Sequence, residues 1–175
     1  MDPRYPIGPF QMDGHTLTEE QRDRFLEQLS EAPTRLREAV RGLSSEQLET
    51  PYRSGGWTLR QVAHHIPDSH INAYVRFKLA LTEQEPTIKT YEEGEWAKLA
   101  DAQESSIETS LQLLEALHHR WVLFLRSLSK ADFARTARHP SWGPVSVDWL
   151  LAQYAWHGRH HVAHITSTRE RMGWS

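Results

Sequence analysis

Four of the chain's 11 histidines fall in one short segment, YAWHGRHHVAHI, which spans residues 154–165. They are His157, His160, His161 and His164, and they form two pairs with a spacing of four residues. Residues four apart on an α-helix stand one above the other, so either pair could chelate a single metal ion. The chain has no cysteine, which excludes thiolate ligands and a thiol nucleophile. The segment therefore predicts a metal site built on histidine.

The two pairs differ in the direction that they would face. At 100° per residue, His157 and His161 fall on or beside the apolar stripe of the helix, whereas His160 and His164 turn progressively toward solvent. Only the first pair points to an interior where a third ligand could arrive from another helix. Two buried imidazoles without a metal or a partner would leave unsatisfied nitrogens, at about 1–3 kcal/mol each. We therefore expect the first pair to be ligands and the second to meet solvent or a subunit partner.

The third ligand should come from a second histidine-rich segment, VAHHIPDSHIN, at residues 62–72. On a helix, His64 faces away from the apolar stripe of this segment, His65 lies at its edge and His70 lies within it. Pro67 lacks an N–H and should bend the helix, which blurs these angles beyond one turn. Geometry alone therefore leaves His65 and His70 both open.

The remaining histidines have no comparable partners. We interpret them as surface or structural residues, with His118 as a reserve ligand: His15, His118, His119 and His139.

The elements that must position these side chains are four amphipathic helices. Apolar residues recur at helical spacing in four stretches, residues 19–43, 59–81, 107–128 and 146–172. Thr18 and Thr58 are each followed three residues later by glutamine, which predicts capping boxes at two helix starts. Pro33 and Pro67 lie inside the first two stretches and predict bends or breaks there.

The fold class that this pattern predicts is all-α, a four-helix bundle in a single domain over residues 1–175. The proline- and glycine-rich opening 15 residues predict an irregular N-terminal arm. A breaker-rich linker, SKADFARTARHPSWGPVS, precedes the last helix and could hold a short hairpin around Gly143 and Pro144. Bundles of this kind build metal sites from side chains on facing helices.

Composition narrows the classes of partner. The net charge is −3 and the basic residues are scattered singly among acids, which argues against nucleic-acid binding. No apolar run approaches about 18 residues and the N-terminus lacks a signal pattern, so we expect a cytoplasmic protein with no membrane partner.

Two long segments make the chain similar to a known family. GGWTLRQVAHHIPDSHINAYVRFKLALTE at residues 55–83, together with YAWHGRHHVAHI at residues 154–165, resembles the DinB-like superfamily, specifically its YfiT-type metal-dependent hydrolases. The opening YPIGPF and the terminal RERMGW resemble the same subgroup, so the likeness covers essentially the whole chain. It implies a four-helix bundle, often a homodimer, with one divalent metal ion held by three histidines. Carried over by position, Trp57 places the first ligand at His65, and the C-terminal pair corresponds to His157 and His161; His64 is the fallback for His65.

The resemblance implies a metal-dependent hydrolase that acts on a small-molecule substrate. Three imidazoles leave at least one coordination position open, as in catalytic sites, and suit Zn²⁺ or Ni²⁺. Hydrolysis also needs a general base, and the nearest carboxylates by sequence, Asp68 and Glu170, have no obvious place beside the histidines. Two alternatives follow: a transferase that uses a low-molecular-weight thiol of the bacillithiol type, as in relatives of this superfamily, or a non-catalytic metal-binding stress module.

Overall fold

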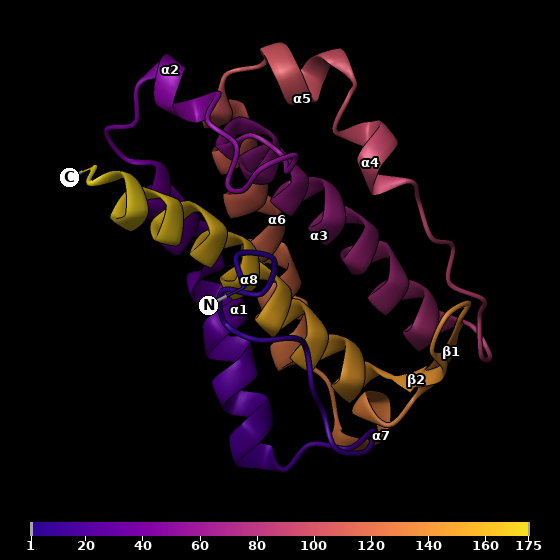
Figure 1. The fold of residues 1–175 in the computed structure, drawn as a ribbon. Helices are drawn as coiled ribbons and strands as arrows, with labels where there is room; N and C mark the ends of the chain where they lie inside the picture. The colour runs from indigo at the N-terminus through magenta and orange to yellow at the C-terminus, as the bar shows by residue number, and fades with distance from the viewer. Residues whose placement is uncertain (1, 175) are drawn as a thin grey trace.

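Four long helices carry the fold in the computed structural model, which describes residues 2–174 (Figure 1). They are α1 (Glu19–Val40), α3 (Leu59–Thr82), α6 (Ile107–Arg126) and α8 (Val147–Met172). Helices α6 and α8 each pack against both α1 and α3. The predicted all-α four-helix bundle is therefore confirmed, and a ligand set drawn from α3 and α8 comes from adjacent helices.

Short elements fill the connections. They are α2 (Ser45–Leu48), α4 (Glu93–Trp96), α5 (Ala100–Glu104), α7 (Lys130–Phe133), β1 (Thr136–His139) and β2 (Gly143–Ser146). Strands β1 and β2 pair antiparallel, with Thr136 opposite Ser146 and His139 opposite Gly143, so the hairpin predicted in the linker is present. Figure 1 shows α4 and α5 in the long connection that leads from α3 to α6.

The helix starts follow the predicted local chemistry. The hydroxyls of Thr18 and Thr58 each accept a hydrogen bond from the backbone N–H of the glutamine three residues on, and both capping boxes are complete. Ser146 caps α8 in a similar way by accepting from the N–H of Trp149. Helices α1 and α3 continue through Pro33 and Pro67, so neither proline ends its helix.

Buried apolar side chains form two clusters along the bundle. One contains Phe77, Trp121 and Tyr154, and the other contains Ile66 and Ile165. Three buried histidines lie at the level between the clusters, one on each of α3, α6 and α8: His70, His118 and His157. We call these three residues the histidine layer. It places a polar section in the middle of an otherwise apolar core.

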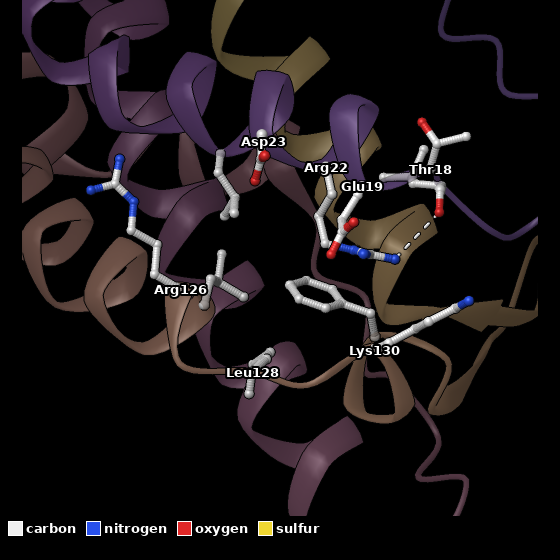
Figure 2. Close-up of a pocket in the computed structure, with 11 residues that line it drawn as sticks. Thr18, Glu19, Arg22, Asp23, Arg126, Leu128 and Lys130 are labelled. Atoms are coloured by element: carbon white, nitrogen blue, oxygen red, sulfur yellow. Dashed lines mark hydrogen bonds between the residues drawn. The ribbon is translucent and has the colours of Figure 1, made fainter.

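A buried ion pair joins the start of α1 to the start of α8. Arg22 Nε lies 2.8 Å from Asp148 Oδ1 and Arg22 Nη2 lies 2.9 Å from Oδ2, while the backbone N–H of Leu17 also donates to Oδ2 at 3.0 Å. The guanidinium lies 4.4 Å from the ring centroid of Phe133. Figure 2 shows Arg22 pointing from α1 toward the segment that carries Lys130. Both residues border a cleft of about 350 Å³.

The N-terminal arm is irregular, as predicted: residues 2–18 form no helix or strand. Figure 1 shows the arm crossing over α8. Trp156 Nε1 donates to the carbonyl oxygen of Gly8 at 3.2 Å, and Phe10 packs edge-on against Trp149 at 5.3 Å between ring centroids. These contacts hold the arm against the helix that carries the four clustered histidines. In residues 2–174, none of the helices combines the length and the apolar character needed to cross a membrane.

Candidate metal centre

The structure brings His65, His157 and His161 together. His65 lies on α3 and the other two lie one turn apart on α8, and one ring nitrogen of each lies within 4.8 Å of the others. The Nε2 atoms of His65 and His157 are 3.2 Å apart. Three imidazoles from two adjacent helices therefore converge on one point, and metal binding at that point stays a prediction.

The electrostatics of the three rings favour the form that binds metal. Desolvation, together with the neighbouring His164 and His160, lowers the pKa of His65 to about 4. Burial likewise puts the pKa values of His157 and His161 well below the usual range. All three imidazoles are therefore neutral at pH 7, and neutral imidazole is the ligand form.

The cluster opens on a cavity of about 480 Å³. The indole of Trp57 packs against His65 at 4.8 Å between ring centroids and forms part of the wall. Charged residues from three separate segments also border it: Arg4, Arg53 and Glu93. A small molecule in this cavity would therefore have imidazoles, guanidinium groups and one carboxylate around it.

Glu93 is the functional candidate that sequence reasoning missed. It lies on α4 and borders the same cavity as the histidines, whereas the carboxylates nearest by sequence, Asp68 and Glu170, do not border it. Desolvation by the surrounding protein raises the pKa of Glu93, and the neighbouring Glu92 raises it further. Glu93 therefore adds a carboxylate to the wall of the cavity that the histidines border, from a segment outside the two histidine-rich helices.

The alternative third ligands lie elsewhere. His64 points away from the cluster, with Nδ1 at 2.7 Å from Ser110 Oγ and Nε2 at 3.2 Å from the carbonyl oxygen of Ser105. His70 is fully buried behind His157, and its Nε2 lies 3.1 Å from Nδ1 of that residue. Of the histidines of α3, only His65 belongs to the three-residue group.

His160 and His164 are not at the surface, which corrects the expectation that they meet solvent or a subunit. Both are buried, because the N-terminal arm and the turn before α3 cover them. The ring of Tyr5 lies 6.1 Å from that of His160, and Tyr52 lies 4.2 Å from His164 between ring centroids. Together with His161 they form a second group of three ring nitrogens within 4.8 Å.

Two histidines interpreted as surface or structural residues are buried. His118 is 2% exposed and His139 is 8% exposed, and both make internal hydrogen bonds, so neither is a surface residue. His119, the residue after His118 on α6, is exposed.

Comparison with known protein families gives one match over most of the chain. Residues 28–165 match the family model described as the DinB superfamily. A protein of Bacillus mycoides (strain KBAB4) is 51% identical over 173 residues, which cover 99% of each chain. A protein of Bacillus cereus (strain AH820) is 50% identical over the same length and coverage. Both carry the name "Putative metal-dependent hydrolase".

Two solved structures share the architecture. YfiT from Bacillus subtilis, described as "a probable metal-dependent hydrolase with an unusual four-helix bundle topology", matches with a TM-score of 0.96 and 44% identity over 100% of both chains. TT2238, described as a four-helix bundle protein, matches with a TM-score of 0.56 and 21% identity over 88% of this chain and 99% of its own. The second likeness concerns the fold alone.

Proposed function

This chain belongs to the DinB superfamily, and from that membership we propose that it is a metal-dependent hydrolase whose divalent ion is held by His65, His157 and His161. The observation that carries the proposal is the convergence of three neutral imidazoles, with ligand atoms within 4.8 Å, at the wall of an open cavity. The names of the Bacillus relatives support the same activity.

The donor set fits a divalent ion. Three neutral nitrogen ligands suit Zn²⁺ or Ni²⁺, and a site with three protein ligands keeps a coordination position open for a reactant. Ser69 Oγ, 3.3 Å from His157 Nε2, adds a polar neighbour to the convergence point. An ion held there would supply Lewis-acid chemistry, which polarises a substrate carbonyl and makes water easier to deprotonate.

Glu93 is the candidate general base. Its raised pKa brings the carboxylate nearer to the pH at which a base works efficiently. In hydrolysis the attacking water would lose a proton to the Glu93 carboxylate while its oxygen bonds to the substrate carbonyl carbon. The same proton would then pass to the leaving oxygen or nitrogen as its bond to that carbon breaks.

The cavity wall indicates the substrate class. Arg53 places a guanidinium group at a site that also presents the indole of Trp57, and Arg4 borders the same cavity while paired with Asp2 at 2.8 Å. Guanidinium groups bind carboxylates and phosphates, and an indole packs against apolar or planar groups. We therefore propose a small anionic ester or amide with an apolar portion as the substrate.

Metal analysis tests the ligand assignment. The purified wild type should bind about one Zn²⁺ or Ni²⁺ per chain, and His65→Ala, His157→Ala and His161→Ala should each lose most of it. His119→Ala is the matched control, since that imidazole is exposed and outside the cluster. Undiminished metal content in all three ligand variants would refute the assignment.

An activity assay tests the reaction. The metal-loaded protein should hydrolyse anionic chromogenic esters or amides in water alone, and Glu93→Gln should reduce kcat by about 10²–10⁴-fold. Glu95→Gln is the control, because that carboxylate lies on the same helix but pairs with Lys98 at the surface. Turnover of electrophiles only with an added thiol would replace the proposal with a thiol transferase. Metal binding without turnover in either assay would favour the stress module.

A further inference from the structure

A chain of three buried imidazoles crosses the whole bundle. His157 Nδ1 on α8 lies 3.1 Å from His70 Nε2 on α3, and His70 Nδ1 lies 2.7 Å from His118 Nε2 on α6. His118 Nδ1 in turn lies 2.6 Å from the carbonyl oxygen of Leu29 on α1. The histidine layer is therefore a continuous hydrogen-bonded chain that begins at a candidate metal ligand and ends on the backbone of the fourth helix.

The carbonyl at the end sets the direction of every bond in the chain. A carbonyl oxygen only accepts, so His118 Nδ1 must carry the proton and donate to Leu29. In a neutral ring, His118 Nε2 is then a bare acceptor, which requires a proton on His70 Nδ1. By the same step His70 Nε2 is an acceptor, and His157 Nδ1 must carry the proton. Each ring is left with one tautomer.

The geometry itself requires neutral rings at His70 and His118. His70, His118 and His157 are 0%, 2% and 9% exposed, so their ring nitrogens depend on one another for hydrogen bonds. A second proton on His70 or His118 would turn an acceptor nitrogen into a donor and leave two N–H groups facing each other.

We propose that this imidazole chain, anchored on the Leu29 carbonyl, holds His157 in the Nδ1–H tautomer and so presents its Nε2 lone pair at the metal-binding point. His70 and His118 are then positioning residues that act through His157. The direction of the exposed lone pair agrees with the 3.2 Å approach of His65 Nε2 to His157 Nε2. The metal in this inference rests on the proposed function, but the tautomer is a property of the metal-free chain.

A shorter chain of the same kind supports His161. His164 Nε2 lies 3.3 Å from the carbonyl oxygen of Arg4, so it donates and leaves His164 Nδ1 as an acceptor. His161 Nδ1 lies 3.3 Å from that acceptor and must carry a proton, which frees its own Nε2. The anchor here is the N-terminal arm. Both candidate ligands of α8 therefore present the same ring nitrogen, because each is hydrogen-bonded to histidines that end on a backbone carbonyl: that of Leu29 for His157 and that of Arg4 for His161.

Long-range ¹H–¹⁵N correlation spectra of the metal-free wild type test the inference directly. The spectra distinguish Nδ1–H from Nε2–H tautomers, and single histidine substitutions assign the signals. We expect His70, His118 and His157 to be neutral Nδ1–H tautomers at pH 7.5. An Nε2–H tautomer or a rapidly averaging mixture at His157 would overturn the proposal, whether or not the protein binds metal.

A variant at the far end of the chain tests the coupling. His118→Phe keeps an aromatic ring beside Trp121 but removes both nitrogens, and His119→Phe is the matched control on the exposed face of the same helix. We expect His118→Phe to lose the single tautomer at His157 and to bind Zn²⁺ about 10–100-fold more weakly, with the control unchanged. Retention of the wild-type tautomer together with wild-type Zn²⁺ affinity would overturn the proposal.

The two measurements separate this inference from the proposed function. Should His118→Phe fail to fold, the wild-type spectra still decide the matter. Should the wild type bind no metal, the proposed function fails while the tautomers remain measurable. Nδ1–H signals at all three rings would then support the chain as a feature of the fold.

Discussion

Replacement of Asp148 by asparagine should destabilise the protein by about 3 kcal/mol, because it leaves the Arg22 guanidinium buried without its counter-charge. The carboxylate is 1% exposed and accepts hydrogen bonds from two nitrogens of Arg22 and from the N–H of Leu17. An asparagine keeps the shape but offers one oxygen for these three donors, and its own NH₂ faces a donor.

The magnitude follows from the geometry. Removing one partner of a buried ion pair costs about 3–5 kcal/mol. We take the lower end, because Arg22 is 8% exposed and its guanidinium keeps the face of Phe133 at 4.4 Å. For a chain of this length the melting temperature should fall by roughly 6–12 °C, at about 2–4 °C per kcal/mol. The loss would be a substantial part of a total stability of about 5–15 kcal/mol.

Urea unfolding of the wild type and variant, followed by circular dichroism, measures the change as a shift in midpoint at constant slope. Asp23→Asn is the matched control: Asp23 follows Arg22 on α1 and is exposed. The double variant Arg22→Met, Asp148→Leu should recover part of the loss, because an apolar pair avoids the desolvation of two charges but leaves the Leu17 N–H without its acceptor. A loss below about 1 kcal/mol for Asp148→Asn, or one equal to that of the control, would refute the reasoning.

Three further changes have defined outcomes. Zn²⁺ at one hundred times its Kd should stabilise the wild type by about 2.7 kcal/mol and raise its melting temperature by roughly 5–11 °C. The melting temperature of His157→Ala should not rise with Zn²⁺, and an equal rise in both proteins would contradict the assigned site. Burial raises the pKa of Asp68 to about 6, above the 3.8 of an unperturbed aspartate. The folded state therefore binds the proton more tightly and loses stability as pH rises from about 4 to 6. Asp68→Asn should therefore stabilise by about 1–2 kcal/mol at pH 8, allowing for the partial exposure of the carboxyl, and by less at pH 5; a gain independent of pH in urea titrations would exclude this cause. A Cβ at Gly158 would lie 3.5 Å from side-chain atoms of Ala32 and His70, which is an ordinary contact. Gly158→Ala should therefore stabilise the protein by about 0.5–1 kcal/mol, whereas the larger side chain of Gly158→Leu should destabilise it by about 1–3 kcal/mol. Thermal melts in which the leucine variant is the more stable of the two would contradict this packing.

The long helices were predictable because their signals are local. A cap residue, a glutamine three positions on and an apolar stripe at helical spacing all lie within one segment, as at Thr18 and Thr58. The end of the breaker-rich linker and the apolar stripe that follows it placed the start of the last helix near Ser146, and Ser146 is the N-cap of α8. The short helices were missed because each is only about one turn long. Helices α4 and α5 also lack a side-chain cap, whereas α2 and α7 have capping boxes but no room for an apolar stripe. Such turns depend on what they pack against rather than on their own residues.

Some residues of the candidate site were likewise predictable from local spacing, and others were not. Helical spacing alone selected His157 and His161, since both angles come from one regular helix. It left His65 and His70 open, because the choice between them depends on how α3 packs against α8. Glu93 and the burial of His160 required contacts with segments far along the chain, which no local pattern reports.

The histidine layer also bears on how the four helices find their alignment. In a purely apolar core one helix can shift along another, because each apolar side chain can pack against the next apolar side chain of the neighbouring helix. The chain from His157 through His70 and His118 to Leu29 draws one member from each long helix, and a shift of any helix by one turn would break at least one of its bonds. Each broken bond would leave a buried nitrogen or carbonyl unsatisfied, at about 1–3 kcal/mol. The histidine layer therefore favours one alignment of the four helices along the bundle axis. The same hydrogen bonds also orient a candidate metal ligand.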